Sequence, residues 1–351
     1  MSALQGLKKR CSRPSLLRAV RYEGQANVWK NAAAVLLILL AACSKQQEFR
    51  QASPVETTGP AVESGRLGPE DLTVIYFLNA HTGLAAGVDN ALFRTVDGGL
   101  TWARMLAADP VGEDFWGIYQ TGLEQVWCCG RGRLLRSIDS GATWTEAQRP
   151  AGMFYHYGAC AAVEGILFMI QPATCGTTVY QTRDGASWAK LPAGMPRNDY
   201  TTLFALDATN LWVAGDYGRL ARTQDGGASW TKTDLTNNTS LAELQFVNSQ
   251  TGWARSLYSG VLVSTDGGAS WMAQETGAQS SYEDLQIQDA AQGHLLASVD
   301  TLRSRLLQTR DGGVTWLETA VISNHLQSLC VAGSNELWVA GAKGFVKKLK
   351  P

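Results

Sequence analysis

The chain has few of the residues that build most catalytic and metal sites. It holds four histidines in 351 residues, and His81, His156, His294 and His325 never fall at the spacing of a metal-ligand motif. The glycines gather in Asp-Gly-Gly turns rather than in a phosphate-binding loop that opens a helix. No Ser/His/Asp arrangement stands out by spacing. We therefore predict a protein that is not an enzyme, with no catalytic residue, no metal site and no cofactor.

Beyond its first 42 residues, the chain also lacks a basic surplus. The formal net charge is −1, but residues 1–42 carry seven Lys and Arg against Glu23 alone, which leaves −7 for the remainder. A mildly acidic remainder gives no electrostatic case for binding nucleic acid. We predict no nucleic-acid partner.

One apolar run interrupts the N-terminal region, from Ala32 to Ala42, just after Lys30. Its length suits the core of a signal peptide and is too short to cross a bilayer. It ends in Leu-Ala-Ala before Cys43, which resembles the lipobox of bacterial lipoproteins. The resemblance implies cleavage before Cys43 and lipidation of that residue. The alternative is an ordinary signal peptide with an incidental cysteine.

Ser44 rather than aspartate follows the cysteine, which in lipoproteins of Gram-negative bacteria implies sorting to the outer membrane. Residues 44 to about 68 are polar and show no sustained apolar periodicity. We predict a lipoprotein signal peptide at 1–42, a flexible tether at 43–68 and a folded domain at 69–351. The lipid anchor would hold the protein in a bacterial cell envelope, at the periplasmic or outer face of the outer membrane.

One short motif dominates the rest of the chain. It pairs Ser or Thr with a following Asp, glycine and a closing Trp, and we call each copy a box. The six boxes are Thr95–Trp102, Ser137–Trp144, Thr182–Trp188, Thr223–Trp230, Ser264–Trp271 and Thr309–Trp316. Their closing tryptophans lie 41 to 45 residues apart. A period in this range predicts a repeat architecture.

The residue types in the box predict a tight turn. A carboxylate accepts backbone N–H bonds within its own turn, and glycine adopts positive φ without steric cost. We expect structural carboxylates at Asp97, Asp139, Asp184, Asp225, Asp266 and Asp311. We expect anchoring indoles, each with its N–H partnered, at Trp102, Trp144, Trp188, Trp230, Trp271 and Trp316. The third box is one residue short, so its turn should differ.

Three apolar runs precede each box and a more polar run follows it, as in Leu203–Leu206, Asn210–Gly215 and Leu220–Arg222. Four short strands in about 42 residues are typical of a β-propeller blade. The box resembles the Asp-box, or BNR repeat, of sialidase propellers, sortilin-type receptors and the photosystem II assembly-factor family. Residues 210–230 are most similar to the assembly-factor type, and the resemblance covers about residues 70–350.

The six box-bearing units are followed by a seventh that ends before any box. Its three runs need a fourth strand, which residues just before 71 are placed to supply. We therefore predict an all-β, seven-bladed propeller of four-stranded antiparallel blades. The alternative is a ring of six blades with a C-terminal appendage.

Loops on one face of such a ring gather aromatic and charged residues, a pattern typical of binding surfaces. The candidate binding residues there are Trp116, Tyr155, His156, Arg197, Tyr200, Tyr217, Tyr258 and Tyr282. A second candidate is a basic stripe formed by Arg94, Arg136 and Arg222, which occupy the position directly before the box in three blades. Ordinary loop packing and pairing with nearby carboxylates are the alternatives.

These patterns favour a binding or assembly platform for an unknown protein partner. The alternative is a glycan-binding or glycan-hydrolysing propeller of the sialidase type, which predicts arginine and carboxylates clustered in the central depression. No catalytic residue of that type carries over, because its Phe-Arg-Ile-Pro segment is absent.

Five cysteines remain beyond Cys43. Cys160 and Cys175 lie in one repeat, and a disulfide between them is one of the alternatives left open. Cys128, Cys129 and Cys330 lie in apolar runs and suit buried thiols.

Overall fold

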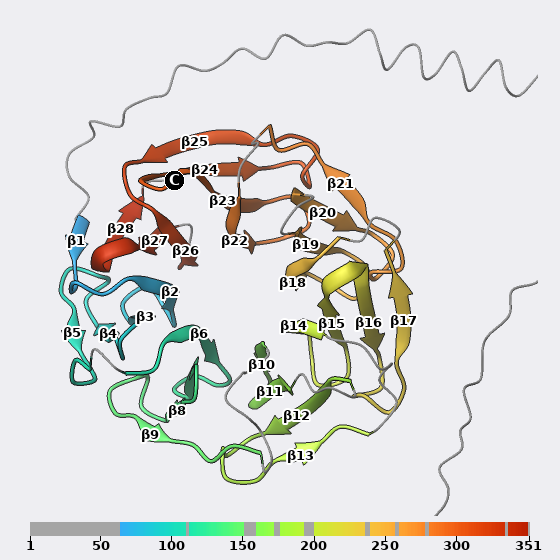
Figure 1. Ribbon diagram of the computed structural model, residues 1–351, viewed down its shortest axis with the longest axis horizontal. Coiled ribbons are helices and arrows are strands. Elements are labelled where there is room, and N and C mark those ends of the chain that lie inside the picture. The colour runs from blue at the N-terminus through green and yellow to red at the C-terminus, as the bar shows by residue number, and fades with distance from the viewer. Residues whose placement is uncertain are drawn as a thin grey trace, which may run out of the picture. The chain divides into compact units, whose positions relative to one another are not determined.

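The structure is a computed structural model that describes residues 64–109, 112–150, 159–171, 176–192, 200–235, 239–256, 260–277, 281–333 and 336–349. These residues form seven four-stranded antiparallel sheets, which are the blades of a ring (Figure 1). The predicted seven-bladed propeller is confirmed. The alternative of six blades with a C-terminal appendage is wrong, because the last three strands complete a blade of their own.

Blades 1 to 6 each use four consecutive strands from the inside of the ring outwards. Blade 1 holds β2 (Leu72–Phe77), β3 (Gly83–Gly87), β4 (Leu92–Thr95) and β5 (Ala103–Arg104). Blade 2 holds β6 (Phe115–Gln120), β7 (Val126–Gly130), β8 (Leu134–Ser137) and β9 (Thr145–Glu146). Blade 3 holds β10 (Cys160–Val163), β11 (Ile166–Gln171), β12 (Thr178–Thr182) and β13 (Ala189–Lys190).

The next three blades repeat this order. Blade 4 holds β14 (Tyr200–Ala205), β15 (Leu211–Gly215), β16 (Arg219–Thr223) and β17 (Thr231–Asp234). Blade 5 holds β18 (Leu241–Phe246), β19 (Gly252–Ser256), β20 (Gly260–Ser264) and β21 (Met272–Gln274). Blade 6 holds β22 (Tyr282–Ile287), β23 (Gly293–Asp300), β24 (Arg303–Thr309) and β25 (Leu317–Ile322).

Blade 7 joins the two ends of the propeller. It holds β26 (Leu326–Ala332), β27 (Glu336–Gly341) and β28 (Phe345–Leu349), and its outer strand is β1 (Ser64–Arg66). β1 pairs antiparallel with β28, with Gly65 opposite Val346. The prediction that residues before 71 supply the fourth strand is confirmed. Since β1 lies inside the segment predicted as a tether, the propeller includes Ser64–Arg66 and does not begin at 69.

Burial explains why the middle strands read as continuous apolar runs. Every residue of β3, β7 and β15 is buried, because both faces of these strands pack against neighbouring blades. First strands such as β2 and β18 alternate between buried and partly buried residues. The short fourth strands are largely exposed. Two 3₁₀ turns, η1 (Asp216–Gly218) and η2 (Ala342–Gly344), join the second and third strands of blades 4 and 7.

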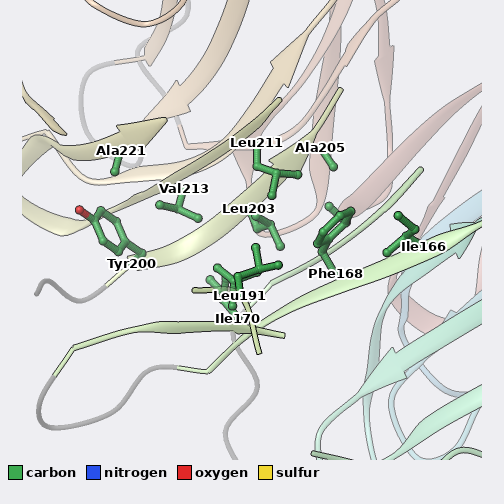
Figure 2. Close-up of a cluster of buried hydrophobic side chains, with 12 residues drawn as sticks. Ile166, Phe168, Ile170, Leu191, Tyr200, Leu203, Ala205, Leu211, Val213 and Ala221 are labelled. Atoms are coloured by element: carbon green, nitrogen blue, oxygen red, sulfur yellow. The ribbon is translucent and has the colours of Figure 1, made fainter. Parts of the chain in front are cut away.

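The core is divided into seven apolar clusters, one at each contact between adjacent blades. Figure 2 shows the cluster between blades 3 and 4, where Phe168 and Ile170 of β11 face Leu203 and Leu211 of blade 4. The cluster between blades 7 and 1 is built in the same way and stacks Trp338 on Phe77 at 4.9 Å between ring centroids. The ring is therefore closed by packing as well as by β1.

Strand alternation separates the loops onto two faces. The boxes and the hairpins between first and second strands share one side, which we call the box face. The hairpins between second and third strands and the crossings between blades share the other, which we call the crossing face. In the part of the chain that the structure describes, no helix has the length and apolar character needed to span a membrane.

Candidate functional site

Five of the six boxes close by the same set of hydrogen bonds. In the fifth box, Asp266 Oδ2 accepts the Ser270 hydroxyl at 2.6 Å, and Asp266 Oδ1 accepts the Ser270 N–H and the Ser264 hydroxyl, each at 2.9 Å. The Ser270 hydroxyl, the Ser270 N–H and the Ser264 hydroxyl hold the pKa of Asp266 at about 2. The equivalent bonds form at Asp97, Asp139, Asp225 and Asp311. Because both oxygens are occupied, these carboxylates serve the turn.

The last glycine of each box, which is the second glycine where a box has two, also contacts the preceding blade. A Cβ on Gly99, whose φ is +87°, would lie 2.1 Å from Cη2 of Trp338 in blade 7. A Cβ on Gly313, whose φ is +89°, would lie 2.8 Å from Trp253 of blade 5. Glycine is thus required here for the backbone conformation and for the close approach of two blades.

The closing tryptophans differ in how their indole N–H groups are satisfied. Trp102, Trp144 and Trp271 donate to the carbonyl of the last glycine of their own box, at 3.0 to 3.2 Å. The indole N–H groups of Trp230 and Trp316 are buried without a partner. The expectation that every indole N–H is partnered is therefore wrong for these two.

Two of the three arginines that precede boxes bond across a contact between blades, and Arg222 does so by donating Nη1 to Gly267 O in the box of blade 5 at 3.4 Å. Arg94 Nε donates to Ser140 O in the box of blade 2 at 2.9 Å. The guanidinium of Arg222 lies 4.7 Å from the ring of Trp212, and Arg136 lies 5.5 Å from Trp127. Burial lowers the pKa of Arg222. All three are half-buried, and a basic stripe that binds a partner stays a prediction.

A channel lies at the centre of the ring. Its cavity volume is about 510 Å³, and the first strands of all seven blades line it. Blades 5 to 7 form a polar wall, which we define as Glu243, Gln245, Glu283, Asp284, Gln286 and Ser328, with Arg255 reaching in from β19. Blades 1 to 4 form a mainly apolar wall, defined as Val74, Tyr76, Tyr119, Ala159, Ala161 and Phe204. The channel therefore has two unlike sides.

Arg255 is held in place by two acceptors of the polar wall. Its Nε donates to Glu243 Oε2 at 3.1 Å, and its Nη1 donates to the carbonyl of Tyr282 at 2.7 Å. Glu243 Oε1 also accepts a bond from Gln245 Nε2 at 2.9 Å. One carboxylate of the wall is thus neutralised by an ion pair that joins β18 and β19.

Asp284 is the most strongly perturbed carboxyl in the channel. Burial raises its pKa to about 8, the charge of Glu243 adds to the rise, and the Leu329 N–H and Arg255 oppose it. Its Oδ2 accepts the Leu329 N–H at 2.7 Å. The side chain lies deep in the ring yet keeps part of its surface open to the channel, so channel water weakens the effect of burial.

The polar wall also covers the free edges of the inner strands. Gln245 Oε1 accepts the Ile287 N–H at 2.9 Å, and Ser328 Oγ accepts the Ile75 N–H at 3.3 Å. Together with Asp284, these side chains link blade 5 to 6, blade 6 to 7 and blade 7 to 1. Inner strands are sheet edges, and such bonds satisfy their unpaired backbone groups.

Two of the predicted binding residues are exposed at the crossing-face end of their strands. Trp116 is 38% exposed and lines the channel near the start of β6. Tyr217 is 63% exposed in η1, and the guanidinium of Arg219 lies 5.3 Å from its ring. These two side chains are available to a partner at the crossing face.

The other predicted binding residues are placed differently or not described. Tyr282 is half-buried, and its hydroxyl lies 2.5 Å from that of Thr276. Tyr200 is 0% exposed and belongs to the cluster of Figure 2, so it is a core residue and the prediction of a surface role is wrong. The remaining four lie outside the described residues: Tyr155, His156, Arg197 and Tyr258.

Cysteine and metal predictions have the following outcome. Cys128, Cys129, Cys160 and Cys330 are buried free thiols. Cys43 and Cys175 lie outside the described residues. Within the described ranges, no group of three or more His, Cys, Asp or Glu side chains is placed to hold a metal ion.

Sequence reasoning missed the polar wall and a set of exposed apolar residues on the box face. The latter are Val96, Leu100, Leu123, Ile138 and Val314, each more than half exposed. The wall had a signal in the repeat: the third position of the first strand holds Val74 and Gly117 in blades 1 and 2, but Glu243 and Asp284 in blades 5 and 6. Acidic residues at an inward-facing position mark the wall.

No protein-family model matches the chain, and no curated protein matches it by sequence. Among solved structures, the chain is similar to "YCF48 bound to D1 peptide", with a TM-score of 0.64, 18% identity, and coverage of 84% of this chain and 99% of that one. It is similar to YCF48 from Cyanidioschyzon merolae, with a TM-score of 0.65, 17% identity, and coverage of 82% and 98%. It also resembles a GH74 enzyme from Niastella koreensis, with a TM-score of 0.53, 16% identity, and coverage of 80% and 43%. At these identities the likeness shows the propeller fold alone.

Proposed function

We propose that this protein is a non-catalytic binding or assembly platform that holds a protein partner on the crossing face. The observation that carries the proposal is the channel of about 510 Å³ with two unlike walls, bordered by the exposed ring of Trp116. Concave sites that combine apolar surface with a few polar groups are the usual places of recognition. Tyr217 extends the same face outwards.

The build of the ring suits this task. Seven apolar clusters fix each blade between two others, so the loops are carried on a stiff support. One similar structure is described as YCF48 bound to D1 peptide, which supports a peptide or protein as the partner class here. The likeness supports no photosynthetic role by itself.

The proposal includes an anchor at Cys43. The apolar run before Cys43 and the polar stretch after it would tether the propeller to a bacterial envelope membrane, with outer-membrane sorting favoured by Ser44. Intact-mass analysis of the mature protein tests this part. A mass that begins at Cys43 and includes acyl chains is expected; an unmodified N-terminus, or cleavage elsewhere, contradicts it.

Site-specific photo-crosslinking tests the platform. A crosslinking amino acid is placed at Trp116 or Tyr217 on the crossing face, or at Leu123 or Ile138 on the box face, which are exposed controls. The full chain is expressed in its native envelope and its adducts are identified by mass spectrometry. One recurrent protein adduct from 116 and 217 but not from 123 and 138 is expected. The same adducts from all four positions, or none from 116 and 217, overturn the proposal.

A glycan-binding or glycan-hydrolysing role is the second candidate. It is favoured by the grouping of Arg255, Glu243 and Asp284 in the channel, which is the arrangement that this alternative predicted. One of the similar folds is a GH74 enzyme. A glycan array, paired with a reducing-sugar assay and the Asp284→Asn variant, tests it. Array binding or sugar release that is lost in the variant supports this role over the first.

A further inference from the structure

We propose that the central channel binds a cation on an apolar stem, an ammonium or guanidinium group that meets the polar wall while its methylenes lie on the apolar wall. The inference rests on the proposed function, since a basic side chain of the protein partner is the source that function implies. A free alkylamine offers the same chemistry and is the second source.

The described lining of the channel holds more carboxyl groups than cationic groups. The wall presents three carboxyl groups, Glu243, Glu283 and Asp284, and Arg255 is the one cation of the channel lining among the described residues. Arg255 is already paired with Glu243. Two carboxyl groups therefore face the channel without an ion-pair partner of their own.

Those two carboxyl groups are held by neutral donors. Glu283 Oε1 accepts the hydroxyls of Ser298 at 2.7 Å and Ser281 at 3.0 Å. Asp284 accepts the backbone N–H groups of Leu329 at 2.7 Å and Leu285 at 2.9 Å. Such bonds fix the direction of each carboxyl and bring no positive charge beside it, and a cation near Asp284, whose pKa burial raises, would favour the ionised form of that group. A cation entering the channel would supply that positive charge beside Glu283 and Asp284.

The opposite wall supplies the second, independent argument. Tyr76, Tyr119 and Phe204 line the channel from blades 1, 2 and 4. Aromatic faces attract cations, and apolar walls take up the methylene stems of Lys and Arg side chains. A small inorganic cation would leave this wall in contact with water, whereas an alkylammonium or alkylguanidinium uses both sides.

Size gives the third argument. A volume of about 510 Å³ lies in the range of small-molecule pockets and exceeds what one extended Lys or Arg side chain fills. The first strands of all seven blades surround it. A single side chain projecting from a partner on the crossing face is therefore able to enter beside Trp116.

Two-dimensional NMR of the full chain provides the test, with n-hexylammonium as the free probe and hexan-1-ol and hexanoate as matched controls. Signals of Trp116 and of the polar-wall residues should shift with n-hexylammonium at an affinity about tenfold above that for hexan-1-ol. Glu283→Gln and Asp284→Asn should each weaken n-hexylammonium binding about tenfold. Glu124→Gln removes an exposed carboxylate outside the channel and should change nothing. Equal affinity for the ammonium and the alcohol, or unchanged binding in both wall variants, overturns the inference.

A ligand-free measurement keeps the inference testable if a wall variant folds poorly. Ala159 lines the channel from β10's side of the apolar wall. Ala159→Lys places an ammonium opposite the carboxyl groups, and Ala159→Glu places a further carboxylate there. The lysine variant should melt at a higher temperature than the glutamate variant, and the reverse order contradicts the proposal.

A pair of peptides distinguishes a basic side chain of a partner from a free amine as the source of the cation. The two are acetyl-Gly-Gly-Lys-Gly-Gly-amide and the same peptide with norleucine in place of lysine. Binding of the lysine peptide above the norleucine peptide supports a side chain of a partner; binding of n-hexylammonium alone supports a free amine. If crossing-face adducts form but neither cation binds, this inference fails while the platform stands. If cations bind but no adduct forms, the platform fails and the channel chemistry stands.

Discussion

The third box forms its turn with one residue fewer than the other five boxes. In the five longer boxes, the residue after Asp donates its N–H to the first hairpin of its own blade, as Gly267 does to Gln250 O at 2.7 Å and Gly98 does to His81 O at 2.9 Å. The third box has no such residue. Its Gly185 takes the place of the second glycine, since its N–H bonds Thr182 Oγ1 at 2.9 Å and it packs on Trp127 of blade 2. The missing residue is thus the first glycine.

The hairpin of blade 3 is shortened to match. Blade 5 joins its first two strands by residues 247–251, whereas blade 3 uses Glu164 and Gly165 alone, with φ of +50° and +80°. The carbonyl that the first glycine would reach is instead bonded by the side chain of Arg183, which donates to Glu164 O at 3.0 Å. Hairpin and box therefore change length together, and a side chain replaces the lost backbone donor.

The shorter turn also changes its anchor. Trp188 donates its indole N–H to Gln148 O of blade 2 at 2.7 Å rather than to its own box. Asp184 accepts the N–H groups of Ala186 and Ser187 at Oδ1, and the hydroxyl bond to Oδ2 seen in the other boxes is absent from this described turn. The difference teaches that the box is a self-contained turn only when the neighbouring hairpin is long enough to support it.

Deleting Gly267 shortens the fifth box to the length of the third. Of the changes proposed, this one should lower the stability of the fold most. The five-residue hairpin stays, so the Gly267 N–H bond to Gln250 and the Trp212 Nε1 bond to Gly267 O at 2.9 Å are both lost. Two buried bonds of this kind are worth ~3 kcal/mol together when their partners stay buried. Urea unfolding measures the loss. As the matched control, inserting a glycine between Asp184 and Gly185 should cost about 1 kcal/mol, since Gly in a loop mainly adds unfolded-state entropy.

Two alanine substitutions at the second glycine of a box compare the cost of the backbone conformation with the cost of close packing between blades. Gly99→Ala and Gly268→Ala both place alanine at strongly positive φ, +87° and +92°. The new Cβ would lie 2.1 Å from Trp338 in the first case and 3.4 Å from Trp212 Nε1 in the second. We expect ~3 kcal/mol of destabilisation for Gly99→Ala and ~1 kcal/mol for Gly268→Ala by chemical unfolding. Equal losses would mean that close packing between blades is not the reason for the second glycine.

Replacing the aspartate of a long box should destabilise the fold more than replacing the aspartate of the short third box. Asp266→Asn weakens two bonds from Ser270 and one from Ser264, and should cost ~1 kcal/mol after allowance for the exposure of the group. Asp184→Asn should cost less, because only Oδ1 is engaged by backbone N–H groups. Thermal melting of the two variants beside the parent checks the order. A larger loss for Asp184→Asn would contradict our reading of the short turn.

The smallest expected effect is on the stability of the fold in acid. The pKa values of Asp97, Asp139, Asp225 and Asp266 are lowered to about 2 by hydroxyl and backbone donors. A carboxyl whose folded pKa lies below its unfolded value stabilises the fold above about pH 4, and loses that contribution as the pH falls towards 2. The melting temperature should therefore fall between pH 4 and pH 2, and fall less steeply in Asp266→Asn than in the parent. Identical slopes would contradict the assignment.

Much of the fold was predictable because its information is local and repeated. Each box marks one turn, the spacing of the boxes sets the blade length, and the unit after Trp316 lacks a box and so requires a strand from elsewhere. β1 meets that requirement. The boundary at 68 was wrong because Ser64–Arg66 carry no apolar pattern: as an outer strand, β1 is recognised by its pairing with β28 and not by its composition.

The candidate site was less predictable because residues from different blades build it. Glu243 and Arg255 come from blade 5 and Asp284 from blade 6, and a single repeat shows nothing unusual until the seven first strands are compared position by position. The same comparison explains Tyr200. It occupies the first position of its strand, where blades 1, 5 and 7 have Leu72, Leu241 and Leu326, all buried. Aromatic character alone suggested a surface role that the repeat position excludes.

The pairing of β1 with β28 has a consequence for biogenesis. Arg66 donates to the carbonyl of Lys343 at 2.8 Å, across 277 positions of the chain. A nascent polypeptide cannot make this bond until residue 343 has left the ribosome, so the first and seventh blades must wait for each other while the middle blades already have their local partners. During that interval β1 has no partner strand and the face of blade 1 that packs on blade 7 is uncovered, which is the stage at which the protein most needs a chaperone to prevent association with other chains.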